Sequence, residues 1–70
     1  MKNWEVEISL VNEFGRVEES RVLQYTDKTS TEVTQAVKEN ISASASSGQR
    51  YQVIVTGTDD DWFSFIMKIE

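Results

Sequence analysis

The chain has 70 residues, with seven basic and twelve acidic side chains and a formal net charge of −5. A chain of this length has room for one hydrophobic core, so residues 1–70 are predicted to form one small domain. Cysteine and histidine are both absent, which excludes disulfides, the usual zinc sites and a Ser-His or Cys-His nucleophile. The sequence also lacks a P-loop and a dinucleotide-binding glycine pattern. We therefore expect a protein that is not an enzyme and that uses no metal, cofactor or small-molecule substrate.

The negative charge also bears on partners and location. Affinity for nucleic acid and for anionic membranes depends on Lys and Arg, so we expect this acidic chain to bind neither directly. No apolar run approaches the roughly 20 residues of a membrane-spanning helix. Residues 1–10 alternate in polarity, unlike the continuous apolar core of a signal peptide. These features predict a cytoplasmic protein whose partner is another protein or a second copy of itself.

The first predicted element is a strand over residues 3–11, followed by a hairpin loop over residues 12–15. Apolar and polar side chains alternate along the strand, which is typical of a half-buried strand. Gly15 can adopt the positive φ that the loop needs. The apolar face of the strand carries Trp4, Val6, Ile8 and Leu10.

A second strand is predicted over residues 16–25, with Val17, Leu23 and Tyr25 on one face. Glu19 and Arg21 interrupt that face, which leaves two interpretations. Either the strand begins near residue 20, or a β-bulge around residues 18 and 19 shifts its register. Its charged side chains favour a position at the edge of a sheet.

A helix is predicted to follow. Thr29 and Glu32 have the spacing of a capping box, which favours Thr29 as the N-cap, with Ser30 as the alternative. Val33, Val37 and Ile41 recur at every fourth position and form a narrow apolar stripe. The serine-rich residues 42–47 and the following glycine predict that the helix ends between residues 44 and 47.

Two more strands are predicted over residues 50–58 and 62–69, giving the order ββαββ. The expected fold is a two-layer α+β domain with the helix on one face of a four-stranded antiparallel sheet. A right-handed crossover favours the strand order 2-1-3-4 over 1-2-4-3. The predicted core beneath the helical stripe comprises Trp4, Val6, Ile8, Leu10, Leu23, Tyr25, Val53, Val55, Phe63, Phe65 and Met67.

The turn between the last two strands contains Asp59, Asp60 and Asp61. Carboxylate oxygens are ligands for calcium or magnesium, but the ligand spacing of a calcium-binding loop is missing. Aspartate also accepts local backbone hydrogen bonds in turns. Both interpretations stay open, and the hairpin turn is favoured. Gly57, just before the turn, indicates a bulge or a close approach of another group to the backbone.

The sheet face away from the helix is predicted to be open and partly apolar. Exposed aromatic and aliphatic side chains that group on neighbouring strands are typical of a protein interface, whereas isolated ones need no explanation. A single-stranded RNA reader would need phosphate-neutralising charges that the chain lacks. The candidate interface residues are Val11, Val22, Ile54, Trp62 and Ile66.

Four glutamates of the first predicted hairpin form the candidate acidic surface: Glu5, Glu7, Glu18 and Glu19. The leading functional hypothesis is a non-enzymatic protein-binding module that acts through the open sheet face, as a homodimer or with a different protein. The alternative is an acidic inhibitor that mimics nucleic-acid phosphates and blocks a DNA- or RNA-binding protein. Small acidic inhibitors encoded by phages act in this way as a class, and the comparison is an analogy.

Overall fold

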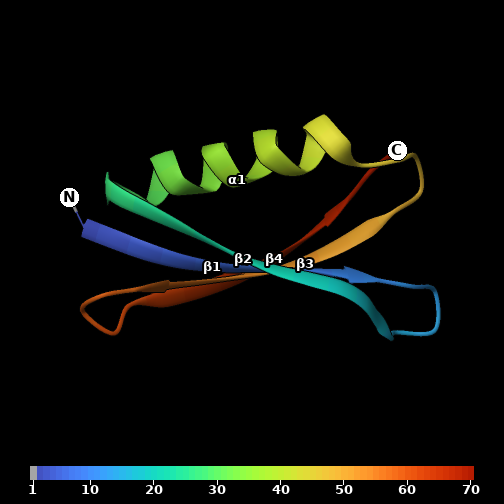
Figure 1. Cartoon of the computed structure of the whole chain (residues 1–70), viewed down its shortest axis with the longest axis horizontal. Helices are drawn as coiled ribbons and strands as arrows, with labels where there is room; N and C mark the ends of the chain where they lie inside the picture. The colour runs from blue at the N-terminus through green and yellow to red at the C-terminus, as the bar shows by residue number, and fades with distance from the viewer. Residues whose placement is uncertain (1) are drawn as a thin grey trace.

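The computed structural model describes residues 2–70 and shows a two-layer α+β fold (Figure 1). One helix lies over one face of a twisted sheet, and the other face is left open. The element order is ββαββ, as predicted. The elements are β1 (Lys2–Val11), β2 (Val17–Lys28), α1 (Ser30–Ser44), β3 (Arg50–Gly57) and β4 (Trp62–Lys68).

The sheet has the order β2-β1-β3-β4, and each neighbouring pair is antiparallel, which confirms the predicted topology. Because β1 lies between β2 and β3 and is antiparallel to both, β2 and β3 run in the same direction. The helix therefore connects two parallel strands across β1, which is the connection that the crossover rule describes. This arrangement leaves β2 and β4 as the two edge strands.

Strand β2 contains the bulge that was one of its two predicted interpretations. Leu10 is paired with Glu19, whereas Val11 is paired with Val17, so Glu18 is the extra residue. The prediction that Val17 shares a face with Leu23 and Tyr25 is wrong, because the bulge at Glu18 shifts the register of the residues that precede it. Val17 is instead exposed and lies across from Val11.

Helix α1 begins with the predicted capping box. The Thr29 hydroxyl oxygen accepts a hydrogen bond from the Glu32 amide at 3.2 Å, and the Glu32 carboxylate accepts one from the Thr29 amide at 2.9 Å. This assigns the N-cap to Thr29 and makes Ser30 the first helical residue. The helix ends at Ser44 and is too short and too polar to cross a membrane.

The core is sealed in its centre and open along β4. The predicted residues of the two edge strands pack against the core but remain half-buried. Leu10, near the end of β1, is also half-buried. One helix is about 10 Å across, whereas four strands span roughly 19 Å, so the sheet is wider than its cover. The accessible surface of 4828 Å² accordingly exceeds the roughly 4,450 Å² expected for this mass. The fully buried apolar residues are Trp4, Val6, Ile8, Val33, Val37, Ile41, Val53 and Val55.

Candidate protein-interaction surface

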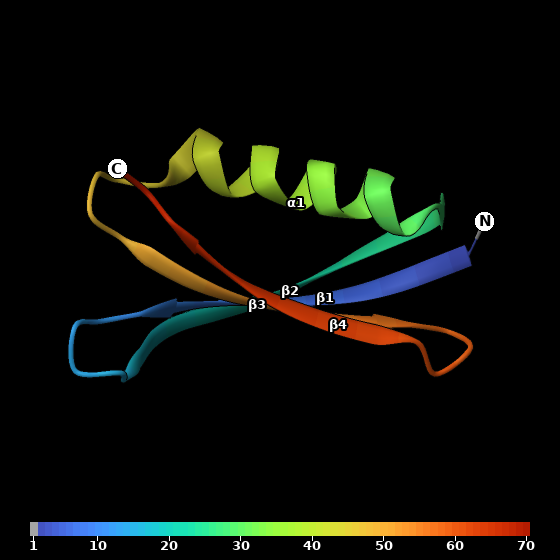
Figure 2. The ribbon, with the colours of Figure 1, turned by 180° about the vertical axis from the view of Figure 1, so that it is seen from behind.

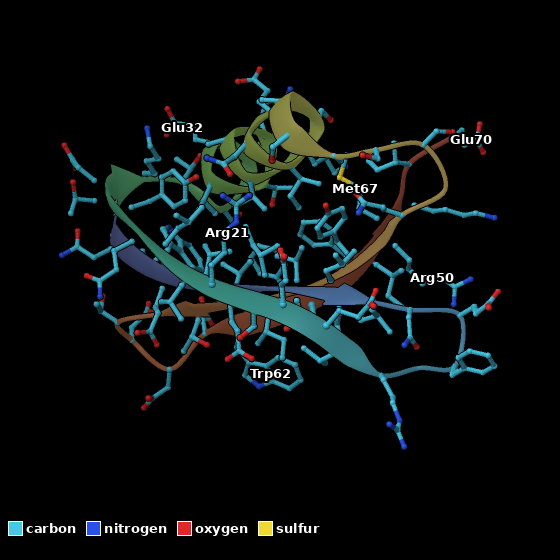
Figure 3. The ribbon with its side chains drawn as sticks, turned by 45° about the vertical axis from the view of Figure 1, so that its right-hand side comes forward. Arg21, Glu32, Arg50, Trp62, Met67 and Glu70 are labelled. Atoms are coloured by element: carbon cyan, nitrogen blue, oxygen red, sulfur yellow. The ribbon has the colours of Figure 1, made fainter. Side chains whose placement is uncertain are left out.

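The last strand presents two large apolar side chains on the open face of the sheet. Trp62 and Ile66 are 68% and 67% exposed, and Ser64 lies between them on the same face. Figure 3 shows the Trp62 side chain on the side of the sheet away from the helix, whereas Met67 points to the helix side. The alternation of β4 therefore places different apolar residues on its two faces.

Strand β3 adds a third residue to this surface. Ile54 is paired with Ser64, so Trp62 and Ile66 are its diagonal neighbours on β4. Diagonal neighbours in an antiparallel pair lie about 7–8 Å apart, within reach of large side chains. Ile54 is 36% exposed, less than either of these two neighbours. We call Ile54, Trp62 and Ile66 the β3–β4 apolar patch.

The other two predicted interface residues lie apart from this patch. Val22 is exposed on β2, but Glu7 on β1 separates it from Ile54, because Glu7 is paired with both. Val11 is half-buried at the end of β1, where it is paired with Val17 and Arg50. The structure therefore brings together three of the five predicted residues.

The four candidate acidic residues are distributed over two faces. Glu5 and Glu7 are exposed on the open face of β1, in the middle of the sheet. Glu19 is paired with Leu10, which belongs to the helix-facing side of β1, and Glu18 lies in the bulge. Only Glu5 and Glu7 therefore lie beside the β3–β4 apolar patch, on the strand next to β3.

The aspartates of the β3–β4 turn contact a lysine from the start of β1. Lys2 Nζ lies 2.9 Å from Asp59 Oδ1 and 2.6 Å from Asp61 Oδ2. Hydrogen bonds to Asp61 and Asp59 raise the pKa of Lys2, and the Lys2 ammonium lowers the pKa of Asp59. Asp60 adopts a left-handed conformation with φ of 67°, as aspartate can in a tight turn. These contacts join the start of β1 to the turn, and residues 2–70 contain no cluster of three metal-ligating side chains.

Sequence reasoning missed a groove between α1 and β4. It has a volume of about 630 Å³, with Thr34 and Lys38 on the helix side and the half-buried Phe63, Phe65 and Met67 on the strand side. The two phenylalanine rings stack with centroids 6.4 Å apart, and Lys38 Nζ lies 5.7 Å from the Phe65 centroid. The signal in the sequence was the narrowness of the helical stripe, since three residues cannot cover four strands.

The β3–β4 apolar patch and this groove both lie at β4, on opposite faces of the sheet. Figure 2 shows β4 in the foreground of the view from behind, at the free edge of the sheet. Both faces and the outer edge of one strand are therefore accessible. Comparison of the chain with protein-family models, with curated proteins and with solved structures finds no match in any of the three.

Proposed function

We propose that this protein is a non-enzymatic binding module that docks on another protein chain through the β3–β4 apolar patch. The observation that carries the proposal is the exposure of Trp62 and Ile66, each about two-thirds accessible, on the same face of one strand with Ser64 between them. Tryptophan is among the residues most enriched at the energetic centres of protein interfaces. Exposed apolar side chains that gather on one face indicate such a surface more strongly than scattered ones.

The surroundings of the patch support the same proposal. Trp62 and Ile66 are paired with the polar residues Thr56 and Gln52 of β3, and Glu5 and Glu7 follow on β1. An apolar centre with a polar rim is the usual anatomy of a protein interface. The matching partner surface would offer an apolar pocket for Trp62 and basic groups opposite the two glutamates.

A second candidate function is inhibition of a nucleic-acid-binding protein by phosphate mimicry. It is favoured by the net charge of −5 and by the exposed positions of Glu5 and Glu7 on a central strand. A phosphate mimic needs an extended array of negative charge, because the groove that it occupies is lined with several basic groups. Glu19 lies on the helix-facing side and Glu18 in the bulge of the far edge strand β2. The array is therefore small, and docking by apolar contacts is the better supported function.

The two candidates differ in which substitution removes binding and in how binding responds to salt. The test immobilises four proteins and identifies which proteins each one retains from a lysate of the cells that produce the native chain. The four are the native chain, Trp62→Ala, Phe14→Ala and the double variant Glu5→Lys/Glu7→Lys. Phe14 is the matched control, since it is 81% exposed but lies in the loop between β1 and β2.

For apolar docking we expect Trp62→Ala to lose a protein that the native chain and Phe14→Ala both retain. The contact should also survive 1 M salt, where the Debye length is about 3 Å. Equal retention by Trp62→Ala and the native chain would refute the proposal. Loss in the double glutamate variant, together with loss in high salt, would favour phosphate mimicry instead.

A further inference from the structure

We propose that β4 pairs edge to edge with β4 of a second copy, so that two chains share one continuous antiparallel sheet. The partner at the β4 edge is thus a second copy of the same chain. This pairing rests on the proposed function only for the role of Trp62 and Ile66. Three independent features carry it: the contrast between the two sheet edges, the direction of the backbone groups of β4, and the self-complementary order of its side chains.

The two edge strands differ in how they are protected. Strand β2 has a bulge at Glu18, charged residues along its length and a left-handed residue, Asp27, near its end. These are the devices that keep an edge strand from pairing with another chain. Strand β4, with the sequence WFSFIMK, pairs with β3 without a register shift and carries no charge before Lys68. The unprotected edge is the one that a second chain can cover.

The backbone groups of alternate β4 residues point to the free edge. Ile69 N donates to Gln49 O at 2.8 Å, Ile69 O accepts from Gly48 N at 2.7 Å, and Asp61 O accepts from Gly57 N. Odd-numbered residues at both ends of the strand thus direct their backbone groups toward β3. In a regular antiparallel strand the direction alternates, so the outward groups belong to Trp62, Ser64, Ile66 and Lys68.

Symmetry restricts how this edge can pair with a copy of itself. A two-fold axis perpendicular to the sheet places paired residues on the same face, as antiparallel pairing requires. The register that overlaps all seven residues of β4 is centred on Phe65. It pairs outward-pointing residues with one another, so each such pair can exchange two backbone hydrogen bonds. The resulting pairs are Trp62 with Lys68, Phe63 with Met67, Ser64 with Ile66, and Phe65 with its own counterpart.

The side chains in this register complement one another on both faces. On the open face, Lys68 of the second copy meets the Trp62 ring, a cation–π pair. On the helix side, Phe65 meets its counterpart, and Phe63 meets Met67, a sulfur–aromatic pair. Lys68 is the one charged residue of β4 and is paired with Trp62, so no like charges face each other along this strand. The groove beside α1 in one copy adjoins the same groove of the second copy across the two-fold axis. The second copy thereby covers the half-buried rings of Phe63 and Phe65.

The first experiment measures association by sedimentation equilibrium for the native chain, Ser64→Pro and Ser64→Ala. Because the Ser64 amide points to the free edge, proline removes a donor there and leaves the hydrogen bonds to β3 intact. Alanine keeps the amide and serves as the matched control. We expect the native chain and Ser64→Ala to reach twice the mass of 8.0 kDa. Ser64→Pro should associate about tenfold or more weakly, with circular dichroism confirming that it is folded.

The second experiment tests the register by oxidative cross-linking. The chain contains no cysteine, so single variants Ser64→Cys, Phe65→Cys and Ile66→Cys each introduce one thiol. Only position 65 faces its own counterpart, at the Cα separation of about 4.5 Å that a disulfide accepts. We expect Phe65→Cys to form a disulfide dimer fastest. If Phe65→Cys does not fold, the double variant Ser64→Cys/Ile66→Cys replaces it, since those positions face each other.

A native chain that stays monomeric at millimolar concentration overturns the inference, as does equal association of Ser64→Pro and Ser64→Ala. Fastest cross-linking at position 64 or 66 overturns the register. The proposed function fails separately. If the native chain is monomeric but Trp62→Ala fails to retain a protein that the native chain retains, only the dimer is refuted. The β4 edge would then be open to a different chain. A dimer whose Trp62→Ala variant retains every protein that the native chain binds refutes docking alone.

Discussion

The indole ring of Trp4 lies against the backbone of Gly57, its partner across β1 and β3. A Cβ atom on Gly57 would come within 3.1 Å of Trp4 Cζ3. The indole is fixed from other sides as well. Its Nε1 donates to Lys28 O at 3.0 Å, its ring meets Phe63 edge-on at 5.9 Å, and Lys2 Nζ lies 4.5 Å from its centroid. Trp4 thus contacts residues of all four strands, and Gly57 leaves the space that it needs.

Gly57→Ala should lower the free energy of unfolding by about 1–3 kcal/mol, as overpacking of a fixed site does. In a Trp4→Phe background the same substitution should cost much less, because the smaller ring leaves room for a methyl group. Urea unfolding of the four proteins gives the coupling between the two sites. An equal cost in both backgrounds would show that the indole is not the obstacle.

Truncating a side chain on the buried face of α1 should lower the free energy of unfolding more than truncating one on β4. Ile41 is fully buried, so Ile41→Ala should cost about 2–5 kcal/mol. Phe65→Ala should cost less than the roughly 3–5 kcal/mol of a sealed phenylalanine, because the groove beside α1 leaves its ring half-exposed. Unfolding at low protein concentration, where the chain is monomeric, is the measurement. A larger loss for Phe65 than for Ile41 would contradict the open groove.

Thr29→Ala should destabilise the protein by about 1 kcal/mol, because it removes the oxygen that accepts the Glu32 amide. Thr29→Ser keeps an oxygen at the same place and should restore most of the loss. Ser30→Ala is the neighbouring control, since Ser30 lies inside the helix and not at the cap. Thermal unfolding of the three variants distinguishes loss of the cap from a general loss of hydroxyl groups. Equal decreases of the melting temperature in Thr29→Ala and Ser30→Ala would contradict the role of Thr29 as the cap.

The Lys2 contacts should make stability depend on pH at both extremes. The pKa of Asp59 is lowered in the folded state by Lys2, so its contribution is present above the unfolded value and is lost as pH falls below about 4. The pKa of Lys2 is raised by Asp61 and Asp59, so its contribution is present below about pH 10.4 and is lost as pH rises through the folded value.

Lys2→Met should therefore flatten the stability profile at both ends, as measured by urea unfolding from acid to alkaline pH. A second acid-sensitive group remains in this variant. The Thr29 backbone amide lowers the pKa of Glu32, so some stability should still be lost in acid. An unchanged alkaline limb in Lys2→Met would show that the contact with the aspartates does not stabilise the fold.

Patterns that are local in the sequence predicted much of the fold. Alternation identified the faces of β1, β3 and β4, because successive side chains of a strand point to opposite sides. The spacing of Thr29 and Glu32 identified the start of α1, since the capping box closes within one helical turn. The strand order followed from chain connectivity and the handedness of the crossover. Gly57 was also rightly read as a close approach, although nothing in the sequence identified Trp4 as the neighbour.

The candidate surface was predicted less completely. The sequence placed Ile54, Trp62 and Ile66 on the open face, where they form the patch, but grouped Val11 and Val22 with them. Pairing alone shows that Glu7 separates Val22 from Ile54. The bulge at Glu18 had a signal in the interrupted pattern of β2, but its position depends on the partner strand.

By itself, the sequence determined which residues form strands and helix, which face of each strand is apolar, and the absence of cysteine and histidine chemistry. Only the tertiary structure decided how deeply those faces are buried. Periodicity specifies direction within one element, whereas burial depends on what lies across from it. A single helix with three buried residues seals Val53 and Val55 but leaves Phe63, Phe65 and Met67 half-open. The strand order brings Lys2 beside Asp59 and leaves β4 at an edge of the sheet.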